Sequence, residues 1–359
     1  MRAPNPAETA SHGADRYVTL DGMRGIAALA VALFHFDQSL VPHGYLAVDF
    51  FFALSGFVLY RAYRPRWEAG LGTRQFLLQR VVRLYPLFLL GVLLTTALAV
   101  HKVTHGLPFG LDLRGIAVSA MFNAAMLPSP MDMPLFPLNV PSWSLFFELV
   151  ANVALIVLLF RLPRLALAAI CVFAAVNLAP IILDHGSGNI GALWGEYGVA
   201  LLRTAFSFTF GVLVGTLPQD HARPSGPGLL CFVLIVVVLA AQVSRFSVAA
   251  YDLGAILVAS PVLLLIGTRV EPGRFIAPVA TFVGDMSYAL YAVHWAFIGL
   301  FRHIRDTLHI PQLPMAAIFL GAMLALAWLC VRWFDAPMRR RMGQWIAPRQ
   351  TARVPLPNV

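Results

Sequence analysis

The feature that most constrains this chain is a series of ten apolar runs, each about as long as a helix that crosses a bilayer. An α-helix needs about 17 to 25 predominantly apolar residues to span ~30 Å of hydrocarbon. Such runs occur at 20–38, 46–62, 76–100, 142–160, 164–183, 198–217, 228–244, 252–268, 276–300 and 313–333. The sequence therefore predicts an all-α integral membrane protein with about ten transmembrane helices.

Composition argues against a soluble protein and against a nucleic-acid partner. Hydrophobic residues make up 59% of the chain and charged residues only 12%, whereas about a quarter of an ordinary soluble domain is charged. The net charge is +9, but the basic residues stand between the apolar runs, which orientation in a bilayer explains. The three cysteines lie inside apolar runs without C-x-x-C spacing, so we expect neither a disulfide framework nor a metal site.

The topology depends on a weaker apolar run at 113–127, which carries Arg114 and Asn123. If this run does not cross the membrane, 20 of the 26 Lys and Arg residues lie on the side of the N-terminus. If it crosses, the two sides hold 13 each. Basic residues concentrate on the cytoplasmic side of membrane proteins, so we predict ten spans with both termini in the cytoplasm.

The domain organisation follows from this topology. We expect a cytoplasmic N-terminal tail over 1–19 without a removable signal, a transmembrane domain over 20–341 and a cytoplasmic C-terminal tail over 342–359. Residues 101–141 form an external segment with five prolines between Pro128 and Pro141, a density that no helix tolerates. This segment is either an irregular cap over the outer mouth, with 113–127 as a re-entrant or interfacial helix, or a flexible loop.

The first apolar run, LDGMRGIAALAVALFHF, places Arg24 and His35 on one helical face. Eleven helical steps make three turns plus about 20° and rise ~16 Å. Ionisable groups at such depth usually line an internal cavity. The alternatives are that Arg24 is an anchor whose charge reaches the membrane surface and that His35 is a hydrogen-bonded packing residue.

Three further ionisable residues are predicted at a depth similar to that of His35. Asp49 lies about one turn below the outer end of the second run, Glu148 shares a face with Ser144 in the fourth, and His294 lies in the outer half of the ninth. A carboxylate at this depth could orient the imidazole of His35, which makes Asp49 and Glu148 candidate catalytic residues. Asp49 could instead be a helix N-terminal residue that the helix dipole favours.

A pair of arginines precedes the third run. Arg80 and Arg83 in RQFLLQRVVRLYP lie on one helical face at the cytoplasmic edge. Guanidinium groups make forked hydrogen bonds to phosphate oxygens, so with Arg24 they could form an anion-binding rim. The competing explanation is that these arginines only orient the protein in the membrane. No G-x-S-x-G, H-E-x-x-H, P-loop or dinucleotide motif is found, so serine-hydrolase, metal and NTPase chemistry are not expected.

With these motifs, the chain resembles the membrane acyltransferase-3 family of bacterial integral-membrane O-acyltransferases. The resemblance rests on LDGMRGIAAL, VDFFFALSGFVL, RVVRLYP, PSWSLFFE, GDMSYALYAVHW and FDAPMRRR, which occur in the order of the family. Two positions depart from the common pattern. Asp335 stands where many relatives have Glu, and the acid after Trp143 stands in SLFFE rather than in SLxVE.

The resemblance implies an activity in the bacterial cytoplasmic membrane. It implies that His35 acts in catalysis, that Arg24, Arg80 and Arg83 help to bind a cytoplasmic acyl-CoA, most simply acetyl-CoA, and that the acyl group passes to a hydroxyl of a carbohydrate or lipid-linked sugar. Acyl-CoA would be a substrate, and no permanently bound cofactor is expected.

Residues near the predicted outer end could contact the acceptor or support the catalytic groups, and these are Trp143, Ser144 and His294. The alternative from another functional class is a secondary transporter or flippase, in which the same buried charges form a relay.

Overall fold

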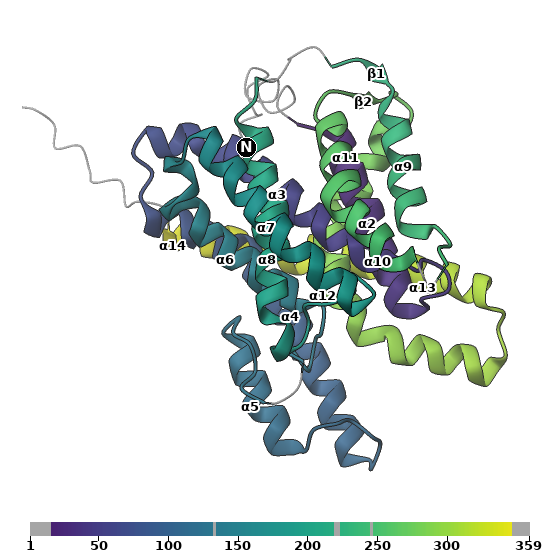
Figure 1. Cartoon of the computed structure of the whole chain (residues 1–359). Coiled ribbons are helices and arrows are strands. Elements are labelled where there is room, and N and C mark those ends of the chain that lie inside the picture. Colours follow the sequence, from purple (N-terminus) through teal and green to yellow (C-terminus); the bar gives the residue numbers. More distant parts are fainter. Residues whose placement is uncertain (1–15, 132–133, 219–222, 245–246, 347–359) are drawn as a thin grey trace, which may run out of the picture.

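The structure is a computed structural model that describes residues 16–131, 134–218, 223–244 and 247–346 (Figure 1). Most of the predicted tails, namely residues 1–15 and 347–359, lie outside the described residues. The helical elements are α2 (Val18–Phe36), η1 (Gly44–Leu46), α3 (Ala47–Glu68), α4 (Thr73–Thr104), α5 (Leu113–Ala124), α6 (Ser142–Val157), η2 (Leu159–Arg161), α7 (Arg164–His185), η3 (Trp194–Glu196), α8 (Tyr197–Gly215), α9 (Gly228–Ala240), α10 (Val248–Gly254), η5 (Ala255–Ala259), α11 (Ser260–Gly267), α12 (Ala277–Leu308), α13 (Gln312–Leu329), η6 (Cys330–Asp335) and α14 (Ala336–Ile346).

All ten predicted runs fall on helices, which confirms the all-α membrane fold. Eight helical segments of the described chain are long and apolar enough to cross a membrane. The other two predicted spans are α9, which has 13 residues, and α12, which has 32 residues and carries Asp285 and His294 in its apolar stretch. The number of crossings and the side on which the termini lie stay predictions.

The weak run at 113–127 forms the short helix α5. Its 12 residues rise only ~18 Å, which is less than the hydrocarbon thickness. The Asp112 side chain caps it by accepting a hydrogen bond from the Gly115 amide at 2.7 Å. α5 packs on α4 and lies at the opposite end of the molecule from the two short strands β1 (Ser225–Gly226) and β2 (Glu271–Pro272) (Figure 1).

α2 and α12 form the most extensive helix pair of the fold and run in the same direction. A Cβ at Gly25 would lie 2.6 Å from Val283. Farther along both helices, His35 contacts His294, so residue numbers rise together on α2 and α12. The predicted topology with ten spans gives these two helices the same direction. If 113–127 crossed the membrane, they would run in opposite directions.

α3 and α8 also run in the same direction, from the Asp49–Arg203 pair to the contact of Tyr60 with Gly215, and they make close backbone contact. Gly56 faces the Phe208 carbonyl, and Gly211 faces the Ala53 carbonyl, so neither position has room for a Cβ. This direction again agrees with the topology in which 113–127 does not cross. Small residues let helix backbones approach, and in lipid such packing is a main source of helix association.

Replacing Gly211 by alanine is expected to destabilise the protein by about 1–3 kcal/mol, because the new methyl group must displace the α3 backbone. Thermal unfolding of the detergent-solubilised protein measures this change. Gly198 lies on the same helix and has no neighbour within 4 Å of its virtual Cβ, so Gly198→Ala is the matched control. Equal melting temperatures for the two variants would contradict the close packing of α3 on α8.

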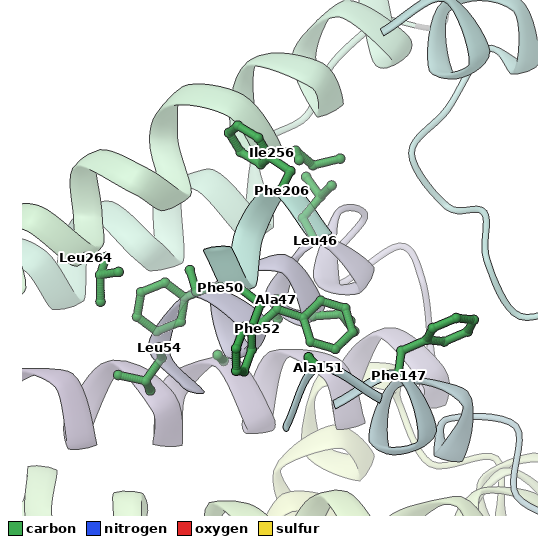
Figure 2. Close-up of a cluster of buried hydrophobic side chains, with 14 of the residues drawn as sticks. Leu46, Ala47, Phe50, Phe52, Leu54, Phe147, Ala151, Phe206, Ile256 and Leu264 are labelled. Atoms are coloured by element: carbon green, nitrogen blue, oxygen red, sulfur yellow. The ribbon is translucent and has the colours of Figure 1, made fainter. Parts of the chain in front are cut away.

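The principal hydrophobic core lies around α3. Phe50, Phe52 and Leu54 of this helix are buried and belong to a cluster with side chains of α6, α8 and the α10 to α11 segment (Figure 2). A second cluster joins α2 to α12 and α13, with Phe36 stacked on Phe319 at 4.9 Å. α2 belongs to both clusters, so the side chains that it presents are held on two sides.

The first turn of α2 is tied to the strand β2, which pairs in parallel with β1. The Glu271 carboxylate accepts a hydrogen bond from the Thr19 amide at 3.1 Å and forms an ion pair with Arg223. Burial raises the pKa of Glu271, against the opposing effects of Arg223 and of the α2 amides. A carboxylate at a helix N-terminus is favoured by the helix dipole, so this contact fixes the end of α2 nearest Arg24.

Candidate functional site

His35 and His294 form a hydrogen-bonded pair at the end of the α2 and α12 contact. The His35 Nδ1 atom lies 3.0 Å from His294 Nε2, and the two ring planes differ by 14° with their centroids 5.2 Å apart. Trp295 meets the His35 ring edge-on at 5.1 Å. The structure therefore brings together two of the residues that the sequence places at similar depth.

Hydrogen bonds to backbone carbonyls determine which nitrogens of this pair carry protons. His294 is fully buried, and its Nδ1 lies 2.9 Å from the Tyr291 carbonyl and 3.1 Å from the Leu290 carbonyl. Carbonyl oxygens only accept, so Nδ1 of His294 carries the proton and Nε2 of its neutral ring is an acceptor. The Nδ1–H of His35 must then donate to His294, which leaves a lone pair on His35 Nε2.

His35 lines a cavity of about 90 Å³ between α2, α3, α6, α8 and α12. Unlike His294, it is partly exposed. Besides His35, the side chains of the cavity wall that carry a polar group are Tyr45, Trp143, Asn189, Arg203 and Tyr291. The rest of the wall is apolar and comes from α2, α3 and the segments that precede α6 and α8, with Val31, Phe34, Val48, Val140, Pro141, Ile190 and Ala192. The cavity is large enough for a short acyl group beside a hydroxyl-bearing carbon.

Asp49 is paired with Arg203 and does not orient His35, contrary to the expectation. Its carboxylate is fully buried and accepts hydrogen bonds from Arg203 Nε at 3.1 Å and Nη2 at 2.5 Å. The guanidinium also donates to the Ile190 carbonyl at 2.5 Å and lies over the Trp143 ring at 5.7 Å. The physical reason is that a buried carboxylate is stabilised far more by a forked cation than by a neutral imidazole.

Glu148 and Arg80 are also paired with each other, which changes the expected role of both. Glu148 accepts from Ser55 Oγ at 2.8 Å and from Arg80 Nη2 at 3.3 Å. Arg80 is 5% exposed, so it does not lie on an open cytoplasmic rim. Glu148 does not orient His35 either, because an acid on an apolar helix takes the nearest cation as its partner.

Arg24 and Arg83 are the accessible arginines of the predicted rim. Arg24 donates to Ser287 Oγ and to the Gly284 carbonyl, both at 3.0 Å, and forms an ion pair with Asp21 at 2.8 Å. Its side chain is 27% exposed. Arg83 is exposed, and the carbonyl of the next residue, Leu84, accepts a hydrogen bond from Tyr288, which is next to Ser287 on α12. The two cations therefore share one surface.

A polar face of α12 connects Arg24 with His35. Gly284, Ser287, Tyr288, Tyr291 and His294 recur at intervals of three and four residues, which places them along one side of a helix. The first two contact Arg24, and the last contacts His35. The predicted common face of Arg24 and His35 is thus matched by a continuous partner on α12.

Ser144 and Trp143 lie beside this face, close to the histidine pair. Ser144 Oγ is buried 2.6 Å from the Tyr291 hydroxyl, which also donates to the Pro141 carbonyl at 3.0 Å. Tyr291 packs against His294 with ring centroids 5.9 Å apart. Trp143 borders the cavity directly. Ser144 therefore contacts a residue that packs on the histidine pair, and Trp143 forms part of the cavity wall.

A second buried cluster of polar groups fixes the loops that form part of the cavity wall. The Asp252 carboxylate, fully buried, accepts from Tyr45 at 2.7 Å, from the Gly188 amide at 2.7 Å and from Ser187 at 3.2 Å, and it lies 2.8 Å from His43 Nδ1. Sequence reasoning missed both Asp252 and Arg203. Each is a lone charged residue at the edge of or within an apolar run, and that isolation is the signal that could have found them.

Comparison with known proteins identifies relatives. The family model described as the acyltransferase domain matches residues 17–332. Peptidoglycan O-acetyltransferase OatA of Listeria monocytogenes is 24% identical over an alignment of 368 positions. The alignment covers 90% of this chain and 56% of OatA. This chain therefore spans little more than half the length of OatA.

Two shorter relatives are covered more completely. Acyltransferase MdmB of Streptomyces mycarofaciens is 26% identical over 315 residues, 79% of each chain. "Protein 2 in picA locus" of Rhizobium radiobacter is 39% identical over 152 residues, which cover 38% of this chain and 80% of that protein. No solved structure gives a significant match.

Proposed function

This chain belongs to the acyltransferase domain family, and from that premise we propose that it transfers an acyl group, most simply acetyl, from cytoplasmic acyl-CoA to a hydroxyl of a carbohydrate or lipid-linked sugar. The observation that carries the proposal is the histidine pair. The His35 ring borders a small cavity and has an unprotonated Nε2. On the other side of the ring, His35 Nδ1–H donates a hydrogen bond to His294 Nε2.

In the proposed reaction, His35 is the general base. Its Nε2 takes the proton of the acceptor hydroxyl as the hydroxyl oxygen attacks the thioester carbonyl carbon. The new C–O bond forms, the C–S bond breaks, and the leaving thiolate takes this proton from the imidazolium. A positioned base contributes about 10²–10⁴ in rate. His294 stabilises the imidazolium because its Nε2 accepts the hydrogen bond from His35 Nδ1.

A two-step route would use the same nitrogen. His35 Nε2 would attack the thioester carbon, the C–S bond would break and the thiolate would leave. The acceptor oxygen would then bond to the acyl carbon as the C–N bond breaks, and the hydroxyl proton would pass to the thiolate. Both routes need the lone pair on Nε2, so the tautomer that the His294 contact sets serves either one.

The donor site is proposed at Arg24 and Arg83. The phosphates of CoA would meet these two accessible guanidinium groups, and the pantetheine arm would follow the polar face of α12 toward His35. The helical rise from Arg24 to His35, ~16 Å, suits an extended arm. Arg80, paired with Glu148, would contact the donor deeper in this path and not at the phosphates.

Removing either rim cation is expected to weaken CoA binding. A charged hydrogen bond contributes about 1.5–3 kcal/mol, so Arg24→Gln and Arg83→Gln should each raise the Kd for CoA about tenfold or more. Binding to the purified protein in detergent can be measured by titration calorimetry. Arg114 is exposed on α5, at the opposite end of the molecule, so Arg114→Gln is the control. Unchanged affinity in both rim variants would contradict this donor site.

The activity itself is tested on surface glycans. Mass spectrometry of glycans from wild-type and deletion cells should show acetyl groups that only the wild type adds. Reconstituted protein supplied with labelled acetyl-CoA should transfer the label to the same glycan. Identical glycans in the two strains, together with glycan movement that needs no acyl-CoA, would favour the transporter or flippase instead.

A further inference from the structure

Arg203 borders the same cavity as His35, and it is the residue with a permanent charge among the described side chains of that wall. It lies on α8, whereas His35 lies on α2. Sequence reasoning counted it only as a positive charge on the outer side of the membrane. In the structure it is 1% exposed, with a guanidinium that is held rigidly inside the protein.

Three of the five guanidinium N–H groups of Arg203 are engaged. Nε and Nη2 each donate one hydrogen bond to Asp49, and Nη1 donates one to the Ile190 carbonyl. A guanidinium carries five N–H donors, so one on Nη1 and one on Nη2 have no acceptor among the described residues. The guanidinium that carries these two N–H groups is held in place, because Asp49 and the Ile190 carbonyl bind the rest of it.

A purely structural explanation accounts poorly for this arrangement. Buried ion pairs are often no more stabilising than apolar residues of the same size, because desolvation offsets the attraction. A pair kept on the wall of a cavity, with two oriented donors left over, instead matches what acyl transfer requires. The carbonyl oxygen gains negative charge in the transition state, and fixed N–H donors stabilise it.

We propose that Arg203 is a catalytic residue of the proposed transfer, in which its two remaining N–H groups bind the carbonyl oxygen of the acyl thioester. As the acceptor oxygen bonds to the carbonyl carbon, the π electron pair of the C=O bond moves to the carbonyl oxygen, and the hydroxyl proton passes to His35. When the carbonyl re-forms, the C–S bond breaks and the thiolate takes the proton from His35. Asp49 is then a positioning residue. This inference rests on the proposed function.

A charge swap separates the catalytic role from a structural one. Asp49→Arg with Arg203→Asp keeps an ion pair between α3 and α8 but moves the guanidinium to the other helix. Asp49→Asn with Arg203→Gln removes both charges together. We expect both double variants to bind CoA like the wild type and to transfer acetyl 10²–10³ times more slowly, the loss typical of a missing oxyanion donor.

Arg203→Lys is the variant to use if the double variants do not fold. It keeps the positive charge beside Asp49 but loses the forked donors, so kcat should fall at least tenfold with an unchanged KM for acetyl-CoA. Arg305→Gln is the control, because Arg305 pairs with Asp37 and Asp306 and does not border the cavity.

Each outcome has a distinct meaning. A folded charge-swap or neutral variant that transfers acetyl within tenfold of the wild-type rate overturns the role of Arg203, as does an Arg203→Lys variant with wild-type kcat. Failure of the wild type itself to bind CoA and transfer acetyl overturns the proposed function. The first result leaves the assignment of His35 intact, so the two failures are distinguishable.

Discussion

Replacing His35 by alanine is expected to lower the rate of acyl transfer by about 10²–10⁴-fold, the usual contribution of a general base. The reason is local: His35 Nε2 carries the lone pair that the histidine pair leaves free, and its ring borders the cavity. The measurement is single-turnover transfer of labelled acetyl from acetyl-CoA to the acceptor by reconstituted protein. CoA affinity should not change, since the rim at Arg24 lies ~16 Å away.

The matched control is His303→Ala. His303 is an exposed histidine on α12, nine positions beyond His294, so its loss removes an imidazole from the same helix without touching the pair. His35→Ala protein that binds CoA and also transfers acetyl at the wild-type rate would refute the general-base assignment and the acyl-imidazole route together.

The helices could be predicted from the sequence because helix formation in a bilayer depends on each segment by itself. Every backbone polar group of a spanning segment must be satisfied within that segment, so each run of suitable length and composition specifies its own helix. The same locality explains why Arg24 and His35 share a face: the helical repeat sets it, without knowledge of any neighbour. In the structure both contact α12, as one face requires.

The partners of the buried acids could not be predicted, because they depend on which helices pack together. Asp49 pairs with Arg203, 154 positions away, and Glu148 pairs with Arg80, 68 positions away. Depth alone placed both acids near His35. Depth, however, does not give the rotation of one helix about another, and that rotation points Asp49 at α8 and Glu148 at α4.

The histidine pair was partly predictable for the same reason. The sequence placed His35 and His294 at similar depth, but the tautomer depends on the carbonyls of Leu290 and Tyr291. These carbonyls lie one turn before His294 on its own helix, so their contact with its Nδ1 is local. The contact between the two rings is not local, and only the packing of α2 on α12 brings it about.

Replacing His294 by phenylalanine is expected to slow transfer by about 10- to 100-fold with little change in the KM for acetyl-CoA. Phenylalanine keeps the ring volume but removes the acceptor of His35 Nδ1–H, and a hydrogen bond to a group that becomes charged is worth about 1.5–3 kcal/mol. That value corresponds to the stated loss in rate. The imidazolium of His35 forms only during the reaction, so the effect should appear in kcat.

His294→Gln distinguishes this role from simple packing. Its side-chain oxygen can accept from His35 Nδ1, so part of the rate should return, although glutamine matches the histidine ring less well in shape than phenylalanine does. If packing alone mattered, the phenylalanine variant would be the more active of the two. That order of rates, measured in the same single-turnover assay, would show that His294 acts by filling space beside His35 and not by holding its proton.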